Sequence, residues 1–207
     1  DISLPDAKAL SNKYFSSWQS GEVPANNFDL PKKPKGVKVS FVHKPGAVQS
    51  LIKIFYPVEF KIGSDNTAQI NVMSNIFGGA FSSYLNANLR EDKGYTYGSR
   101  GRVNSDKYIG NFSCSASVRN EVTDSSVQQM LFEMNRIRNE YVDSLDLERI
   151  KNNMIGDFAL SLENQQTIAR FALNIERYNL PKNYYREMLD KVQSVTKTMV
   201  KEVALEY

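Results

Sequence analysis

The sequence predicts an α+β fold in which helices cover one face of an antiparallel-rich sheet. Alternating apolar residues at 37–43, 49–58, 95–103 and 108–117 indicate four strands, arranged as two pairs with turn-like sequence inside each pair. Segments with apolar residues at helical spacing lie between the two pairs and after the second pair. Strands grouped in hairpins, with helices grouped between them, are typical of an α+β layer.

The first two strands are expected to form a hairpin. Segment 37–43 places Val37, Val39 and Phe41 on one face, and segment 49–58 alternates until a proline closes it. Because the "KPGA" between them is turn sequence, a hairpin is the simplest pairing, although other pairings within one sheet remain open.

Each helical segment has one apolar stripe, which we interpret as facing the core. The first helix is expected from Pro5 to about Gln19, and another begins near Asp65 and is broken by Gly78 and Gly79. The glycine pair is interpreted as a sharp corner between helices where only glycine fits. The other predicted stripes are Phe81, Tyr84, Leu85, Leu89; Val127, Met130, Leu131, Met134, Ile137, Tyr141; Leu147, Ile150, Met154, Phe158; and Ile168, Phe171, Ala172, Ile175, Tyr178, with a last helix or pair of helices over about 183–204.

Residues 21–36, "GEVPANNFDLPKKPKG", mark the best internal boundary. Three prolines make this stretch an extended linker, and its lysines are interpreted as solvating that linker. We therefore expect residues 1–36 to be the end of a preceding domain plus the linker, and residues 37–207 to be a second domain.

Composition excludes several classes of function. The net charge of +3 is small and no aromatic residues alternate with the lysines, so nucleic-acid binding is not expected. No apolar run approaches the roughly 20 residues that a membrane helix needs. His43 is the only histidine and Cys114 the only cysteine, so the chain lacks the usual ligands for catalytic zinc and the pair of cysteines for a disulfide.

The stretch "NLREDKGYTYGSR", residues 88–100, suggests a site. Arg90 ends a helical stripe, Gly94 is the expected left-handed cap, and Tyr95 and Tyr97 lie two apart on the next strand, where they face the same side. A guanidinium and a phenol both donate hydrogen bonds, which suits a developing oxyanion rather than proton abstraction. From spacing alone, a surface arginine and two tyrosines that pack on the sheet remain the favoured interpretation.

The longer stretch "GGAFSSYLNANLREDKGYTYG" resembles the signature of the second, non-zinc domain of bacterial pitrilysin/insulinase-type zinc peptidases, the inverzincin group. "HKPGAVQSLIKIFYP" resembles the early strands of that domain, and "DLERIKNNMIGDFALSLEN" resembles a later helix. "DISLPDAKALSNKYFSSW" resembles the close of the preceding domain. The resemblance covers residues 37 to about 204 and implies a mixed or antiparallel-rich sheet covered by helices, as in one half of a clamshell.

The resemblance also implies roles for particular residues. In the family, the first domain binds zinc through H-x-x-E-H, and the second contributes an Arg/Tyr pair to the substrate. Arg90 and Tyr95 match that pair as the predicted catalytic residues: Tyr95 would donate its hydroxyl to the scissile carbonyl, and Arg90 would hold the peptide backbone. Phe81 and Ser82, in the glycine-rich corner, are the predicted substrate-binding residues.

No H-x-x-E-H occurs in this chain, so it is expected to bind no metal itself and to be inactive alone. The implied zinc would lie in a zinc-bearing domain of the same protein or of a partner subunit, and a peptide would be the substrate. The chain is accordingly expected to be a fragment of a protein about twice its length. Two alternatives remain open: a non-catalytic scaffold of the same family, and a module that binds peptides at an exposed sheet edge. The sequence carries no signal that separates bacterial periplasm from cytoplasm.

Overall fold

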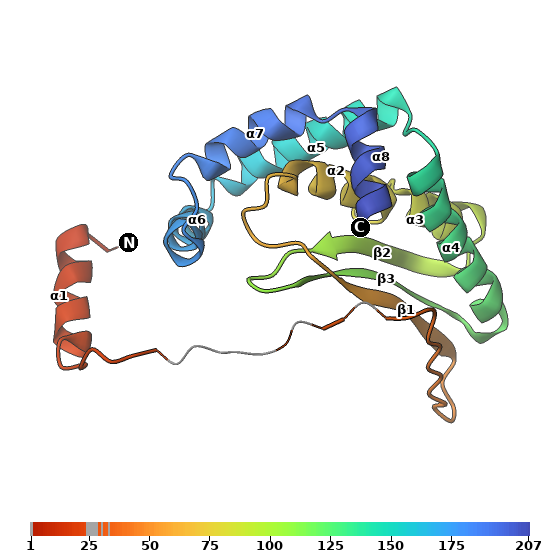
Figure 1. Cartoon of the computed structure of the whole chain (residues 1–207), viewed down its shortest axis with the longest axis horizontal. Helices are drawn as coiled ribbons and strands as arrows, with labels where there is room; N and C mark the ends of the chain where they lie inside the picture. The colour runs from red at the N-terminus through yellow and green to blue at the C-terminus, as the bar shows by residue number, and fades with distance from the viewer. Residues whose placement is uncertain (1, 24–28, 30, 33) are drawn as a thin grey trace.

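The computed structural model describes residues 2–23, 29, 31–32 and 34–207. A three-stranded antiparallel sheet is built from β1 (Gln49–Val58), β2 (Thr96–Asn104) and β3 (Gly110–Arg119) in the order β1-β3-β2. Helices lie on one face of this sheet (Figure 1). The predicted α+β class is therefore confirmed.

The predicted hairpin between segments 37–43 and 49–58 is wrong. Residues 37–43 pair with no strand, and the predicted inward stripe of Val37, Val39 and Phe41 is exposed. β1 pairs with β3 over its whole length, from Gln49↔Arg119 to Val58↔Gly110. A turn sequence dictates only a local reversal of the chain, whereas β3 offers a partner of matching length that also buries the inward residues of β1.

Helix α2 (Thr67–Phe77) lies across the centre of the covered face. Its Ile70, Ile76 and Phe77 are almost completely buried and belong to the same cluster as Phe112 and Val118 of β3. Amphipathic spacing therefore corresponds to burial in this part of the chain, as predicted. The other helical elements are α3 (Tyr84–Asn86), the π-helix η1 (Ala87–Asp92), the 3-10 turn η2 (Asn120–Val122), α4 (Thr123–Asn139), α5 (Ser144–Ser161), α6 (Gln165–Tyr178), α7 (Tyr184–Ser194) and α8 (Lys197–Glu206).

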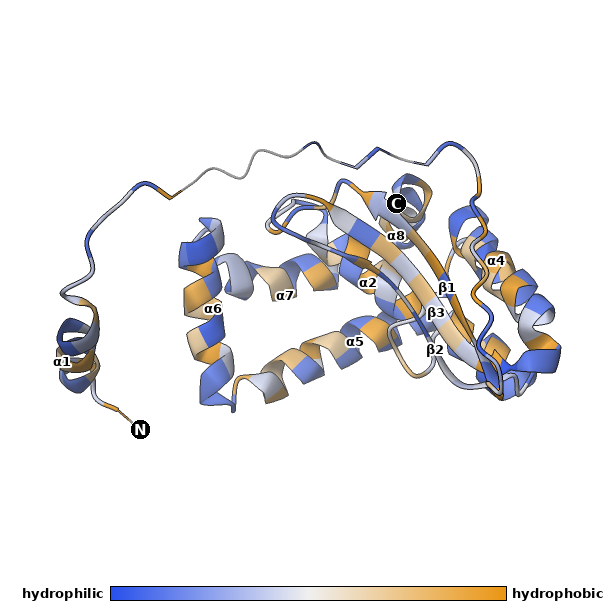
Figure 2. Ribbon diagram, turned by 90° about the horizontal axis from the view of Figure 1, so that it is seen from below, coloured by the Kyte–Doolittle hydropathy of each residue, from blue (hydrophilic) through white to orange (hydrophobic). Residues whose placement is uncertain are grey.

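Helix α6 departs from the core-facing interpretation. Only Thr167 of this helix is buried, and Ile168 is half exposed. Phe171 stacks between Phe158 of α5 and Tyr185 of α7, with ring centroids 5.6 Å and 3.7 Å apart. The helix lies beyond the end of the sheet (Figure 2), and Phe171 of its apolar stripe packs against these two neighbouring helices.

Helix α1 (Leu4–Phe15) starts at the N-cap Ser3, whose hydroxyl accepts the Asp6 N–H at 3.3 Å. It ends at Phe15, short of the predicted Gln19, and none of its residues is buried. Part of the predicted linker 21–36, namely residues 24–28, 30 and 33, lies outside the described residues. No described helix is both long enough and apolar enough to cross a bilayer.

Candidate functional site

The glycine corner after α2 brings the chain against β2. The Gly101 N–H donates to the Gly78 carbonyl at 3.3 Å, and a Cβ on Gly78 would lie 2.4 Å from the Gly101 nitrogen. No side chain fits at that distance, so the corner requires glycine for packing. The predicted structural role of this glycine is therefore supported by its close contact with the strand.

Phe81 follows the corner and lies outside the helix that was predicted to contain it. Helix α3 begins only at Tyr84, and the Phe81 side chain is 70% exposed rather than part of a buried stripe. The Arg90 guanidinium lies over the Phe81 ring, 4.4 Å from its centroid. A cation held against an aromatic face in this way is attracted to the ring and limited in its motion.

Arg90 is carried by the π-helix η1, one residue beyond Leu89, the predicted end of the helical stripe. Single π-helical turns within helical segments are frequent at functional sites. Gly94, at φ +60°, ends the element as predicted, and the Tyr95 N–H closes the cap by donating to the Leu89 carbonyl at 2.8 Å.

A buried acid anchors η1 to α4. The carboxylate of Glu133, only 2% exposed, accepts from Asn88 Nδ2 at 2.7 Å and from Arg136 Nη1 at 3.4 Å. The Arg136 guanidinium also lies 4.1 Å from the ring centroid of Tyr84, whose pKa is raised by burial. In the sequence, Glu133 lies at helical spacing between the apolar residues Met130 and Ile137. An acid at such a position indicates a buried carboxylate that needs hydrogen-bond donors, and this was the sequence signal for the network.

A β-bulge sets the direction of Tyr97. Thr96 pairs with Val118 and Ser99 pairs with Ala116, so β2 advances by three residues while β3 advances by two. Without the extra residue, Tyr97 would share the buried side with Ser99; with it, Tyr97 is 93% exposed. Strict alternation predicted that Tyr95 and Tyr97 face one side, and the bulge overturns that prediction.

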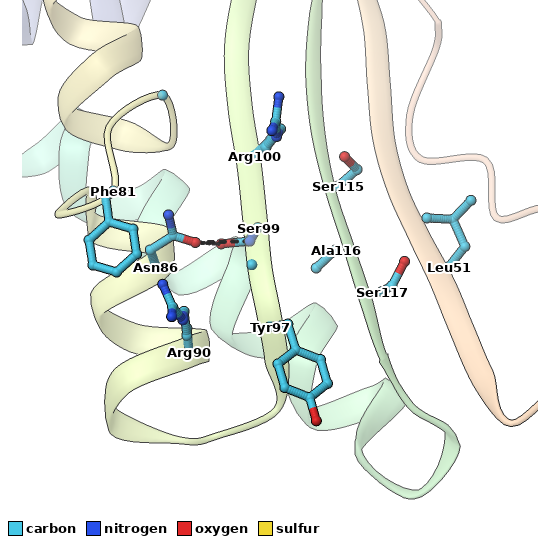
Figure 3. A pocket seen from close by; sticks show the side chains of 12 residues that line it. Leu51, Phe81, Asn86, Arg90, Tyr97, Ser99, Arg100, Ser115, Ala116 and Ser117 are labelled. Carbon is cyan, nitrogen blue, oxygen red and sulfur yellow. Dashed lines mark hydrogen bonds between the residues drawn. The ribbon is translucent and has the colours of Figure 1, made fainter.

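The bulge is held by local hydrogen bonds and by an anchor from the helix. Thr96 Oγ1 accepts the Gly98 N–H at 3.2 Å and lies 2.7 Å from the Ser117 carbonyl. Asn86 Oδ1 accepts both the backbone N–H and the hydroxyl of Ser99, at 2.9 and 3.0 Å. The helical and strand sides of the site are therefore joined by a buried amide (Figure 3).

A cavity of about 470 Å³ lies between these two sides. Phe81 and Arg90 form one wall, and Tyr97 lies at one end (Figure 3). The sheet supplies Leu51 from β1, Arg100 from β2, and Ser115 and Ser117 from β3. No carboxylate or imidazole is found among the described residues that line it, so its polar side chains are hydrogen-bond donors, hydroxyls and one amide.

Two of the four predicted site residues meet at this cavity. Arg90 and Phe81 line it in mutual contact. Tyr95 is half-buried and packs against the core, and the exposed Ser82 is also not among the lining residues. Tyr97 was not predicted as a site residue, because its position depends on the bulge.

The site contains no metal ligands of the usual kind. Among the described residues, no group of three or more His, Cys, Asp or Glu side chains could hold an ion. Burial raises the pKa of the Cys114 thiol to about 12, so this thiol stays protonated and is not a nucleophile. The residues present therefore do not fit zinc, and they define an α+β domain with a donor-lined cavity.

Solved structures share this fold over the whole chain. A peptidase M16 inactive domain from Pseudomonas fluorescens aligns with 100% of this chain and 49% of its own, at 19% identity and a TM-score of 0.81. A protease from Helicobacter pylori aligns with 100% of this chain and 50% of its own, at 19% identity and a TM-score of 0.84. The periplasmic protease PqqL from Escherichia coli aligns with 100% and 23%, at 14% identity and a TM-score of 0.74. This chain thus spans about half the length of the first two.

The sequence profile of the peptidase M16 inactive domain matches residues 1–154. The chain therefore belongs to the peptidase M16 inactive domain family, and the resemblance drawn from residues 78–98 is confirmed at family level. No curated protein matches the chain in a sequence search.

Proposed function

We propose that this chain is the substrate-binding, non-zinc half of a zinc metallopeptidase, and that a zinc domain of the same protein or of a partner subunit carries out the hydrolysis. The observation that carries this proposal is the cavity, which is lined by Arg90 and Tyr97 and, among the described residues, by no carboxylate or imidazole. Such a site can bind peptide carbonyls and stabilise negative charge, but it has no group that would activate water. When bound in the other domain, zinc would supply that activation by lowering the pKa of a water ligand.

Arg90 is proposed to hold the peptide backbone. Its guanidinium offers several hydrogen-bond donors in one plane. Stacking on Phe81 limits the positions it can adopt before the substrate arrives, which lowers the entropy cost of binding. Its contact with Glu91, at 3.4 Å between Nε and Oε1, is a partly exposed ion pair, which is weak and easily exchanged for a ligand.

The oxyanion donor is proposed to be a tyrosine of the same segment. The family resemblance assigned this role to Tyr95, and that assignment stays a prediction, as does substrate binding by Ser82. Tyr97 is the candidate that the cavity favours, because its exposed phenol lies at the end of the cavity that Arg90 lines. The two phenols can be separated because replacement by phenylalanine removes the hydroxyl and keeps the ring.

The test is hydrolysis of an unstructured peptide by this chain together with its zinc-bearing partner domain. Tyr97→Phe should lower kcat by about 100-fold, the size of effect seen when one oxyanion donor is removed, while Tyr95→Phe stays within about twofold. Tyr141→Phe, on an exposed ring near the end of α4, is the matched control. If Tyr95→Phe lowered kcat and Tyr97→Phe did not, the oxyanion donor would be Tyr95. If both variants kept full kcat, the proposed role would be wrong, and absence of hydrolysis in the unmodified pair would favour the non-catalytic scaffold.

A further inference from the structure

The sheet face opposite the helices carries a defined set of side chains. We call this surface the open face (Figure 2). Its residues alternate with the inward core residues along each strand and are exposed or half-buried. The open face consists of Leu51, Lys53 and Phe55 on β1, Ser113, Ser115, Ser117 and Arg119 on β3, and Arg100 and Arg102 on β2.

Strand register arranges these side chains in rows across the sheet. Ser115 pairs with Lys53 on one side and with Arg100 on the other. In the next row Ser113 lies between Phe55 and Arg102, so this row has a cation on one side only. Because neighbouring strands are about 4.8 Å apart and alternate residues are about 7 Å apart, the cations border a central row of hydroxyls.

The charge of the open face is entirely positive. The three strands contain Lys53, Arg100, Arg102 and Arg119 and not one Asp or Glu. Within the described parts of the chain, none of these four cations takes part in an ion pair. Lys53 lies 5.3 Å from the ring centroid of Phe55, a contact that leaves its charge uncompensated. The positive field of this surface is therefore available to an anionic ligand.

The open face continues the cavity. Arg100, Ser115 and Ser117 belong both to the cavity lining and to the open face, so a polypeptide held by Arg90 would extend over the cationic rows (Figure 3). Arg100 and Arg102 lie two residues apart on one strand, which matches the spacing of alternate side chains in an extended peptide. Guanidinium groups pair with carboxylates through two parallel hydrogen bonds.

We propose that the substrate of this site is an acidic peptide whose carboxylates, at alternate positions, pair with Arg100 and Arg102 on the open face. This inference rests on the proposed function, since it assumes that the peptide enters the cavity beside Arg90. The serine hydroxyls bind the peptide backbone, and Leu51 and Phe55 cover its apolar positions. A polypeptide is favoured over a nucleic acid because the open face continues the cavity beside Arg90, and because Phe55 is the only aromatic side chain among the residues that define the open face.

The experiment measures equilibrium binding by fluorescence anisotropy, with the protein in its full natural form. The probes are two labelled peptides, alternating Thr-Glu and alternating Thr-Gln, of equal length. The variant Arg100→Gln/Arg102→Gln removes two open-face cations. The control Arg170→Gln/Arg186→Gln removes two exposed cations from α6 and α7, so that the net charge is the same.

We expect the Thr-Glu peptide to bind the unmodified protein about fivefold more tightly than the Thr-Gln peptide at low salt, as expected for two exposed ion pairs. The open-face variant should lose this preference, while the control keeps it, and high salt should abolish it. If the double variant is unstable, Lys53→Gln on β1 replaces it in the experiment. This variant should also reduce the preference for the Thr-Glu peptide. Equal binding of both peptides, an equal loss in the control, or tighter binding of a single-stranded oligonucleotide would overturn the inference. Binding requires no zinc and no hydrolysis, so failure of the catalytic proposal would be seen separately in kcat.

Discussion

Gly101→Ala probes the close approach between β2 and the glycine corner on which the site is built. A Cβ at Gly101 would lie 2.3 Å from Phe77 Cε1 and 2.9 Å from Leu85 Cδ1. Both neighbours are completely or almost completely buried, and the Phe77 ring packs against Phe112 with centroids 5.8 Å apart. The added methyl therefore has to displace a packed ring by about an ångström, and overpacking of this kind costs about 1–3 kcal/mol.

We expect Gly101→Ala to lower the free energy of unfolding by about 3 kcal/mol, the upper end of this range, because both neighbours are tightly packed. For a chain of this length, each kcal/mol lowers the melting temperature by about 2–4 °C, so Gly101→Ala should melt roughly 6–12 °C below the unmodified protein. Thermal unfolding followed by circular dichroism measures the difference.

Gly98→Ala is the matched control for this substitution. It lies on the same strand, and a Cβ there meets nothing within 4 Å, so its melting temperature should change by less than about 2 °C. If Gly101→Ala melted together with Gly98→Ala, the close contact of β2 with Phe77 would be refuted, and with it the position of the cavity wall.

Two further predictions concern the anchor of η1 and the start of α5. Glu133→Ala should lower the free energy of unfolding, measured by urea unfolding, by about 3 kcal/mol. Glu133→Gln should lower it by only about 1 kcal/mol, because the amide keeps an acceptor for Asn88. Equal losses in the two variants would contradict the charged network. The Asp143 carboxylate accepts the N–H groups of Leu145 and Asp146, which lowers its pKa. Its stabilisation is therefore fully present above about pH 4 and is lost as the pH falls through the lowered folded-state pKa. Asp143→Ala should melt below the unmodified protein at neutral pH, and the gap should close toward about pH 2; a gap that does not depend on pH would rule out the charged cap.

Local sequence predicted most elements of secondary structure, because they depend on periodicity and backbone geometry within a few residues. The positions of β2 and β3 and the helices α4, α5, α7 and α8 follow from apolar spacing. Gly94 was predicted as a left-handed cap, and its φ of +60° agrees. Arg90 and Phe81 were predicted as site residues, and the cavity includes both.

Long-range pairing decided what local patterns did not. The turn sequence before β1 favoured a hairpin with residues 37–43, but β3, some 60 residues later, is the partner that buries the inward face of β1. The open face also depends on long-range pairing. Lys53 and Arg100 lie far apart in the sequence, and they share one row of the sheet because both pair with Ser115 of β3.

The sequence by itself determined the α+β class, the glycine corner, the capped end of the Arg90 helix and the family, since each is written in contiguous residues. The tertiary structure alone decided which tyrosine reaches the cavity. One extra residue in β2 reverses the alternation of side chains and turns Tyr97 outward, while Tyr95 packs against the core. A bulge is created by the hydrogen-bond register between two strands, and that register exists only after β2 and β3 have paired.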